Sequence, residues 1–285
     1  MTTIIGSLEE ISHLYDAIFC DVWGVVHNGL RASLSANSAL RQFRQTGKPV
    51  VLLTNSPRLS GAVIAQSRAL GVPDDSYDTI VTSGDAARQA LANGDFGARI
   101  FHLGPDSAIS FFEGGAGTDS TVELVGLSAA EGIVCTGLVD DETETPEDYR
   151  ELLTTASRRQ IRMLCANPDI VVDRGSHRVY CAGALAAFYE ELGGEVFMYG
   201  KPHRWIYDLA RQQVDGEGEQ RILCIGDGIL TDVKGAESQS LDCLFVSGGL
   251  SAGETGTGSQ PDPDLLEHFL ASSGVSPGFA IGHLR

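Results

Sequence analysis

Positive charge is scarce in this chain. Its 285 residues include 20 lysines and arginines against 38 aspartates and glutamates, which gives a formal net charge of −18 at pH 7. A field of that sign repels phosphate backbones and anionic lipid, and this argues against nucleic acids and membrane surfaces as partners. A small anionic substrate would therefore need a local pocket that supplies positive charge or a metal ion.

Long hydrophobic runs are missing as well. No apolar stretch approaches the roughly 20 residues that a membrane-spanning helix needs. The first residues carry Glu9 and Glu10 rather than a basic segment followed by an apolar one, so we expect no secretory signal. The six cysteines include no C-x-x-C pair, and four of them lie in apolar, strand-like runs. Buried, reduced thiols of a cytoplasmic protein are therefore expected, rather than disulfides or a zinc site.

Several familiar catalytic motifs are absent too. The sequence holds no Walker-type phosphate loop, no G-x-G-x-x-G and no nucleophilic serine elbow, and its histidines lack metal-ligand spacing. The chain instead shows a regular alternation of strand-like and helix-like segments, such as strands at 17–20 and 48–53 with a helix at 33–46 between them. That alternation predicts an α/β fold, in which helices wrap a parallel sheet.

The pattern changes character at about residue 85. Strand-like runs continue beyond it, but an acidic, turn-rich patch at 140–146 sets this segment apart. We expect residues 85–183 to form an inserted α/β domain. Residues 1–84 and 184–285 would then build one Rossmann-like, doubly wound core around a parallel sheet.

Polar residues stand at the ends of several predicted core strands. Asp21 and Asp227 each follow an apolar run, and Thr54-Asn55 follow another. Ligands of open α/β sheets bind beyond the carboxyl ends of the strands. Together with Lys201, this set suits phosphoryl transfer through a carboxylate nucleophile. Taken singly, each residue also fits a plainer role in a turn, a helix cap or an exposed loop, and it is their order and placement that favour a site.

Four sequence motifs in this order are typical of one group of enzymes. The motifs are Phe19-Cys20-Asp21-Val22-Trp23-Gly24-Val25, Leu52-Leu53-Thr54-Asn55, Gly200-Lys201-Pro202 and Ile225-Gly226-Asp227-Gly228-Ile229-Leu230-Thr231-Asp232. With them, the chain resembles the haloacid dehalogenase-like hydrolase superfamily, and more narrowly its subfamily IIA, the nitrophenylphosphatase-like group. The resemblance spans nearly the whole chain and implies an α/β cap inserted between the second and third motifs. Ala166-Asn167-Pro168-Asp169 looks like a further signature of the subfamily.

The resemblance implies a nucleophile and a Mg²⁺ site. Asp21 would attack phosphorus and form an aspartyl-phosphate. Its carboxylate would also bind Mg²⁺ together with Asp227 and the backbone carbonyl of Trp23, because this hard cation prefers oxygen ligands. Asp232 would either hold the metal ligands in their orientation without contacting the ion or serve as a further ligand.

The resemblance also assigns the contacts to phosphate. The Thr54 hydroxyl and the Asn55 amide would hold phosphate oxygens. Lys201 would bind phosphate and act in catalysis, because its charge offsets the repulsion between the nucleophilic carboxylate and an anionic phosphoryl group.

Trp23 departs from the pattern of the family's phosphatases, which usually carry a second aspartate at this position. That aspartate protonates the leaving group and later activates water, and an indole N–H can do neither. Its loss should cost about 10²–10⁴-fold in rate on substrates with poor leaving groups. His27, on the following loop, is the nearest candidate acid or base, with a structural loop histidine as the alternative.

Three functions remain open for such a sequence. One is a Mg²⁺-dependent phosphatase for a small phosphorylated metabolite, either weak or restricted to activated phosphates. Another is a metal-independent dehalogenase-type hydrolase, since the haloacid dehalogenases also carry an aromatic residue where Trp23 stands. Those enzymes have no reason to keep Asp227 and Asp232, which argues against this second function. The third is a catalytically weak module that binds phosphate ligands.

The cap of such an enzyme closes over the core site and selects the substrate. Asn167, Asp169 and Arg174 are the candidates for this selectivity, with a solvated loop as the alternative. Caps of this type can also pair, so a homodimer is a further expectation.

Overall fold

The computed structural model describes residues 2–113, 122–174, 177–214 and 220–285. Within it the chain divides into two compact units. Unit 1 comprises residues 1–54, 63–81 and 201–285, and unit 2 comprises residues 55–62 and 82–200. No helix within the described ranges combines the length and the apolar character required to cross a bilayer.

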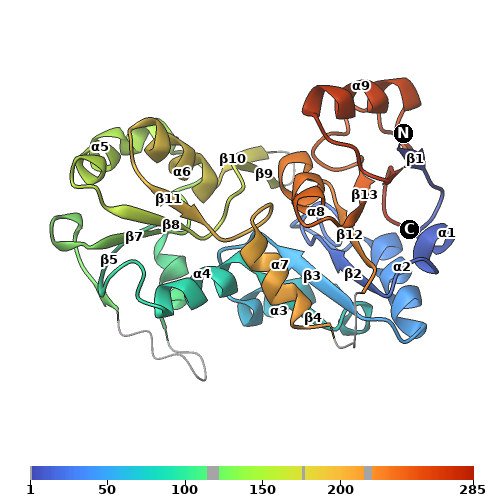
Figure 1. The fold of residues 1–285 in the computed structure, drawn as a ribbon, viewed down its shortest axis with the longest axis horizontal. Helices are drawn as coiled ribbons and strands as arrows, with labels where there is room; N and C mark the ends of the chain where they lie inside the picture. The colour runs from blue at the N-terminus through green and yellow to red at the C-terminus, as the bar shows by residue number, and fades with distance from the viewer. Residues whose placement is uncertain (1, 114–121, 175–176, 215–219) are drawn as a thin grey trace. The chain divides into compact units, whose positions relative to one another are not determined.

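Unit 1 is built on a seven-stranded sheet (Figure 1). Its strands follow the order β1-β14-β13-β12-β2-β3-β4. Their bounds are β1 Thr3–Ile4, β2 Ala17–Cys20, β3 Val50–Thr54, β4 Thr79–Thr82, β12 Ile222–Gly226, β13 Asp242–Val246 and β14 Phe279–Ile281. β2 pairs in parallel with β12 on one side and with β3 on the other. The chain therefore winds outward from β2 in both directions, and the predicted α/β fold with a doubly wound parallel core is confirmed.

Helices cover both faces of this sheet. They are α1 Glu9–Ser12, α2 Leu34–Gln45, α3 Ser60–Ala69, α7 Arg204–Arg211, α8 Lys234–Ser238 and α9 Pro263–Ser273, with short turns η1 Asp74–Ser76 and η5 Ile229–Val233. Successive strand residues point to opposite faces. Ile18 accordingly packs in one core cluster with Leu40 of α2, whereas Phe19 packs in another with Tyr207 of α7. Because both faces are buried, the core strands read as uninterrupted apolar runs.

Unit 2 has a sheet of its own, in the order β11-β8-β7-β5-β6, and a separate antiparallel hairpin of β9 and β10. The strand bounds are β5 Arg99–Leu103, β6 Glu123–Leu124, β7 Gly132–Cys135, β8 Arg162–Cys165, β9 Val171–Arg174, β10 His177–Tyr180 and β11 Val196–Met198. The helices are α4 Ser83–Ala92, α5 Arg150–Arg158 and α6 Ala182–Glu191, with the short turns η2 Asp106–Phe111, η3 Leu127–Ala129 and η4 Pro146–Tyr149. Leu153 of α5 and Leu185 of α6 share a core cluster with Met163 of β8.

The predicted domain boundaries differ from this division. The long segment of unit 2 begins at Thr82, close to the predicted boundary at 84/85, but it ends at Gly200 rather than at residue 183. The reason is strand pairing, because β11 pairs with β8, Phe197 opposite Leu164, so this strand belongs to the second sheet. A helix followed by a strand looks alike in both units, and alternation alone does not tell which sheet a strand joins.

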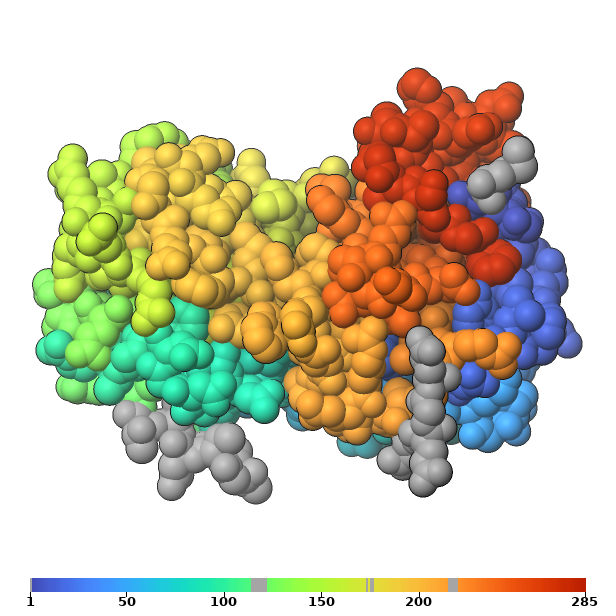
Figure 2. All heavy atoms as spheres, in the orientation of Figure 1, coloured from blue at the N-terminus to red at the C-terminus, as the bar shows by residue number. Residues whose placement is uncertain are grey.

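The two ends of the chain meet in unit 1. β1 pairs in parallel with β14, and the backbone N–H of Leu8 donates to the carbonyl of Arg285 at 2.8 Å. Figure 2 shows the blue amino-terminal atoms beside the red carboxy-terminal atoms at the surface of this unit. The terminal strands thus form one edge of the core sheet.

Candidate active site

Asp21 is placed by β2, an interior strand of the sheet of unit 1. β2 consists of four apolar residues, all buried, between β12 and β3. The backbone N–H of Asp21 donates to the carbonyl of Ile225 at 2.8 Å, so the ladder with β12 reaches one residue past the strand. The Asp21 side chain consequently stands at the carboxyl edge of the sheet, and the residue is only 7% exposed.

Lys201 joins Asp21 to Asp232. Its Nζ donates to Asp21 Oδ1 and to Asp232 Oδ1, both at 2.6 Å, and the residue is 3% exposed. Burial acts against a charged amine, but the two carboxylates outweigh it and leave the pKa of Lys201 above its ordinary value. The ammonium therefore keeps its charge beside both carboxylates.

Asp227 and Asp232 follow β12 and are held by backbone donors. Asp227 Oδ2 accepts from the N–H of Leu250, and Asp232 Oδ2 accepts from the N–H of Gly228, each at 3.0 Å. A Cβ added at Gly249 would collide with the Asp227 carboxylate. The close approach of this backbone to the carboxylate therefore requires glycine.

The three carboxylates form one cluster. Asp21, Asp227 and Asp232 are all buried, and one oxygen from each lies within 4.8 Å of the others. Burial raises the pKa of Asp21, and the Lys201 ammonium opposes that rise. A hard divalent cation prefers carboxylate oxygens as ligands, and these three buried carboxylates lie close enough to share one ion. The donor set of this cluster thus fits Mg²⁺.

Trp23 lies in a tight loop with His27. The N–H of Gly24 donates to the carbonyl of His27 at 2.8 Å, and the two aromatic rings meet edge to face with their centroids 5.4 Å apart. His27 Nδ1 accepts from the N–H of Gly29 at 3.2 Å, and burial lowers the pKa of this histidine. These contacts favour a neutral ring with a structural place in the loop. A role of His27 as acid or base stays a prediction, as does the metal contact of the Trp23 carbonyl.

The phosphate-binding pair predicted at the end of β3 divides between the two units. Thr54 is the last residue of β3, next to β2, and is buried at the same edge of the sheet as Asp21. Asn55 belongs to unit 2, where its Nδ2 donates to Asp169 Oδ1 at 2.8 Å. Asn55 is thereby bound to a residue predicted for selectivity, and the phosphate contacts of both Thr54 and Asn55 stay predictions.

The other selectivity candidates are also engaged within unit 2. Asn167 Oδ1 accepts from the N–H of Asp169 at 3.0 Å, which fixes the turn after β8. The Arg174 guanidinium donates to both carboxylate oxygens of Asp141, at 3.0 and 2.6 Å. Among the predicted site residues, the structure brings together two sets: Asp21, Lys201, Asp227 and Asp232 in unit 1, and Asn55, Asn167 and Asp169 in unit 2.

One contributor to the site lies outside the predicted set. The loop after β13 supplies the Leu250 N–H to Asp227, and a backbone donor has no side-chain signature in a sequence. The available signal is Gly248-Gly249, which follows Ser247, one residue beyond the carboxyl end of β13, a parallel strand that ends at Val246. Loops at that edge are the ones that gather around ligands in such sheets.

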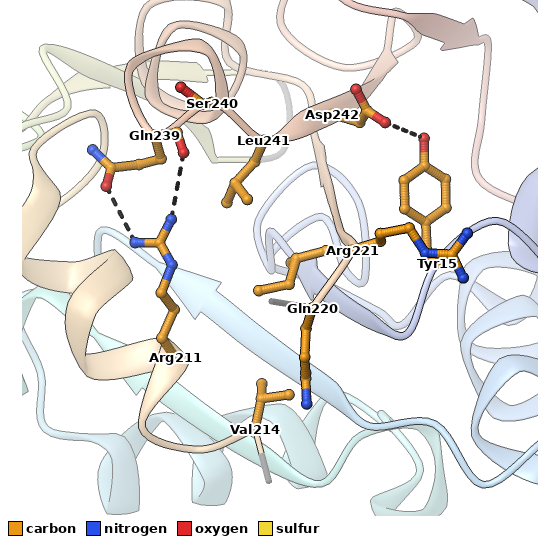
Figure 3. A pocket seen from close by; sticks show the side chains of 10 residues that line it. Tyr15, Arg211, Val214, Gln220, Arg221, Gln239, Ser240, Leu241 and Asp242 are labelled. Carbon is orange, nitrogen blue, oxygen red and sulfur yellow. Dashed lines mark hydrogen bonds between the residues drawn. The ribbon is translucent and has the colours of Figure 1, made fainter. Parts of the chain in front are cut away.

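A cavity of about 590 Å³ lies away from this cluster, at the amino ends of β12 and β13 (Figure 3). Its charged lining is already paired. The Tyr15 hydroxyl donates to Asp242 Oδ2 at 2.8 Å, and the Arg221 guanidinium donates to both carboxylate oxygens of Asp16 at 3.2 Å. The Arg211 guanidinium lies 3.7 Å from Asp208 Oδ1. Both arginines in the described lining are therefore paired with carboxylates, which leaves no unpaired cation there to select an anionic substrate, and the candidate site remains at the carboxyl edge.

Protein-family models match both segments of the chain that supply the three carboxylates. The family model of the haloacid dehalogenase-like hydrolases matches residues 18–115, and a HAD-hydrolase-like model matches residues 198–271. The crystal structure of a haloacid dehalogenase-like hydrolase from Brucella suis 1330 is similar with 44% sequence identity and a TM-score of 0.84. That match covers 99% of this chain and 100% of the other.

Two further relatives are more distant. The ribonucleotide monophosphatase NagD of Escherichia coli K12 is 25% identical over 246 residues, which cover 82% of this chain and 88% of that protein. A 4-nitrophenylphosphatase from Thermotoga maritima shares the fold, with 20% identity, a TM-score of 0.71 and coverage of 96% of each chain.

The fold is that of an α/β protein with a buried cluster of three carboxylates at the carboxyl edge of its sheet. The chain belongs to the haloacid dehalogenase-like hydrolase family. The resemblance to the haloacid dehalogenase-like hydrolases predicted from the four motifs is confirmed.

Proposed function

We propose that this protein is a Mg²⁺-dependent phosphatase that acts on a small phosphorylated metabolite through an aspartyl-phosphate at Asp21. The observation that carries the proposal is the Lys201 ammonium, held 2.6 Å from both Asp21 and Asp232 beside a third carboxylate, Asp227. Membership of the family supports a hydrolase. The similarity to ribonucleotide monophosphatase NagD supports a phosphate ester as the class of substrate.

The reaction would proceed by two displacements at phosphorus. In the first, a carboxylate oxygen of Asp21 bonds to phosphorus while the bond to the leaving-group oxygen breaks, and the leaving group departs with that electron pair. In the second, water attacks the same phosphorus and gives up a proton to solvent, while the bond between phosphorus and Asp21 breaks. Inorganic phosphate and the free Asp21 carboxylate result.

The neighbours of Asp21 have separate tasks in this proposal. Lys201 would stay charged beside the nucleophile and reduce its repulsion toward the phosphoryl oxygens. Asp232 would hold the Lys201 ammonium in that position. Thr54, at the same edge of the sheet, would offer its hydroxyl to a phosphate oxygen. The nucleophile would thus approach phosphorus in a preorganised cationic and polar setting.

Trp23 would restrict the range of leaving groups that the enzyme can expel efficiently. Mg²⁺, bound by Asp21, Asp227 and the backbone carbonyl of Trp23, would stabilise negative charge on the phosphoryl oxygens. The Trp23 indole, however, cannot protonate the departing oxygen. Acyl and aryl phosphates, whose leaving groups are stable as anions, should therefore react, whereas alkyl phosphates should lose about 10²–10⁴-fold in rate.

Unit 2 takes the role of the cap that selects the substrate in this proposal. Asn167 and Arg174 remain candidates for that selection. The proposal extends to a homodimer formed through unit 2 and to a cytoplasmic location. The cysteines support the latter, since all six lie in the described residues and are buried and free.

Hydrolysis of p-nitrophenyl phosphate and of acetyl phosphate, with Mg²⁺ and with EDTA, tests the proposal. Both leaving groups depart without an acid, so Trp23 should silence neither reaction. We expect turnover that requires Mg²⁺ and disappears in Asp21→Asn. Asp16→Asn, the same change before the amino end of β2, should leave the turnover intact. Turnover that survives Asp21→Asn would rule out the aspartyl-phosphate.

The alternatives give different results in the same set of assays. Release of chloride from 2-chloropropionate, without hydrolysis of p-nitrophenyl phosphate or acetyl phosphate, would identify a dehalogenase. Binding of inorganic phosphate without turnover of any of the three compounds would identify a binding module.

A further inference from the structure

A group of residues in unit 2 lies next to three of the four places where the chain passes from one unit to the other. These passages occur at 54/55, 62/63, 81/82 and 200/201. Asn55 and Gly200 stand at two of them, and Ser83 stands one residue beyond a third. A Cβ added at Gly200 would meet Asn55 Oδ1, with Pro168 Cδ at 2.6 Å and Ser83 Oγ at 2.9 Å. We call Asn55, Ser83, Gly200 and the adjoining Asp169 the crossing cluster.

Asp169 is the charged member of the crossing cluster, and its backbone is fixed on both sides. Its N–H donates to Asn167 Oδ1 at 3.0 Å, and its carbonyl accepts from the N–H of Gly183 at 3.1 Å in the first turn of α6. A Cβ at Gly183 would collide with the carbonyls of Pro168 and Asp169, so this packing is close. The carboxylate that accepts from Asn55 Nδ2 at 2.8 Å is therefore presented from a rigid turn.

Two residues of the proposed phosphate site are one peptide bond away from the crossing cluster. Thr54 precedes Asn55, and Lys201 follows Gly200. Because the peptide unit is planar, the Cα atoms of Thr54 and Lys201 each stay at about 3.8 Å from that of a member of the crossing cluster, so the cluster restricts where they can lie. Misplacement of a catalytic group by about 1 Å can cost about 10²-fold in rate.

We propose that Asp169 is a positioning residue, an inference that rests on the proposed function. By holding the Asn55 carboxamide it sets the position of Thr54 and, through the contact between Asn55 and Gly200, that of Lys201. A carboxylate would repel a phosphorylated substrate, which makes direct recognition by Asp169 unfavourable. Asparagine suits position 55, because its amide N–H donates to the carboxylate while its carbonyl oxygen faces the bare Cα of Gly200.

Three variants separate positioning from substrate selectivity. Asp169→Asn keeps an oxygen acceptor for Asn55 Nδ2, and Asp169→Ala removes it. Asp106→Asn, at an exposed aspartate of the same unit, is the matched control. The values of kcat and KM are measured for acetyl phosphate and p-nitrophenyl phosphate, together with the inhibition constant of inorganic phosphate. Acetyl phosphate and inorganic phosphate offer almost nothing for a selectivity residue to contact.

Asp169→Ala is expected to lower kcat for acetyl phosphate and for p-nitrophenyl phosphate by a similar factor, about 10- to 100-fold, and to weaken inhibition by inorganic phosphate. Asp169→Asn should stay within about threefold of the wild type, because the hydrogen bond persists. Equal losses in the alanine and asparagine variants would overturn the proposal. A raised KM for p-nitrophenyl phosphate, with acetyl phosphate and inorganic phosphate unaffected, would also overturn it and return Asp169 to selectivity.

If Asp169→Ala does not fold, a double variant in which Asn55 and Asp169 exchange residue types tests the positioning role of Asp169. Asn55→Asp alone sets two carboxylates against each other and should lose phosphate affinity. Adding Asp169→Asn restores one hydrogen bond with donor and acceptor exchanged, and should recover about tenfold or more of that loss. No recovery in the exchanged pair would overturn the proposal.

Binding of inorganic phosphate, followed as a rise in the melting temperature, keeps this inference apart from the proposed function. If the wild type hydrolyses neither acetyl phosphate nor p-nitrophenyl phosphate, the proposed function fails. Loss of the phosphate-induced rise in melting temperature in Asp169→Ala would still support a positioning role of Asp169. If the wild type hydrolyses both phosphate compounds and Asp169→Ala has the same kcat and phosphate binding, the positioning role of Asp169 is wrong and the proposed function is retained.

Discussion

The Lys201 ammonium lies 2.6 Å from Asp232 Oδ1, at the same distance as from Asp21 Oδ1. One lysine is therefore the counter-ion of two buried carboxylates and also the cation nearest to the proposed nucleophile. The first role concerns folding and the second concerns chemistry. They can be told apart, because a metal ion can balance the carboxylates without replacing the lysine in catalysis.

Lys201→Met should destabilise the fold. Removing one partner of a buried ion pair costs about 3–5 kcal/mol, since the remaining charges stay buried. We expect the melting temperature to fall in EDTA and to recover in part with Mg²⁺, while turnover stays lost. Thermal denaturation in both conditions measures this, with Lys234→Met, exposed on α8, as the control. A variant as stable as the wild type in EDTA would contradict the ion-pair argument.

Trp23→Asp should widen the range of leaving groups. The new carboxyl group would stand where the family's phosphatases usually carry their acid. We expect the rate on glycerol 2-phosphate, relative to that on p-nitrophenyl phosphate, to rise by about 10²–10⁴-fold. Trp23→Phe brings no acid and should leave this ratio unchanged. If the ratio in Trp23→Asp also stays where it is in the wild type, the limit on leaving groups lies elsewhere.

Gly249→Ala should weaken the metal site. The added Cβ would collide with the Asp227 carboxylate, so the loop must withdraw and the Leu250 N–H would lose its contact. Loss of such a supporting bond typically costs about 10- to 100-fold in metal affinity. Gly253→Ala is the matched control in the same loop, because a Cβ there meets nothing within 4 Å. Activity titrated against Mg²⁺ gives the comparison, and an equal Mg²⁺ requirement in both variants would count against the cluster as a metal site.

Arg88→Met should stabilise unit 2. Arg88, on α4, is 5% exposed, and none of its guanidinium nitrogens has a hydrogen-bond partner among the described residues. Burying a guanidinium without hydrogen-bond partners is costly, because its donors lose water and gain nothing in return. An apolar side chain of similar length should raise the free energy of unfolding by about 1–3 kcal/mol.

Urea denaturation measures the effect of the Arg88 substitution. Arg68→Met, which removes an exposed pair with Asp74, is the control and should leave stability nearly unchanged. A loss of stability in Arg88→Met would show that the guanidinium has a partner in solution.

The strand-end positions of the acid cluster could be predicted from the sequence. Asp21 and Asp227 follow apolar runs too short for helices, and parallel strands bring their carboxyl ends to one edge. Lys201 and Asp232 could be assigned to the same edge because motifs of known order accompany them. The side-chain chemistry at this edge thus depends on local patterns that a sequence displays.

Other features depend on tertiary contacts and could not be predicted. β11 reads like a core strand, and only its pairing with β8 assigns it to unit 2. The hydrogen bond between Asn55 and Asp169 joins residues 114 positions apart, and the sequence suggested a different role for each. The Leu250 N–H is a backbone group, and any residue type carries one.

The separation of Asp21 and Lys201 by 180 positions has a consequence for biosynthesis. The sheet strands of unit 2 lie in one continuous stretch, so this unit can complete its sheet while the chain is still being made. β2 must wait for β12, which emerges from the ribosome after all of unit 2. Until then the edge of β2 that will face β12 stays unpaired, open to wrong partners. The proposed catalytic centre can consequently be assembled only after unit 2 has been translated, and a nascent chain that stops before β12 cannot possess it.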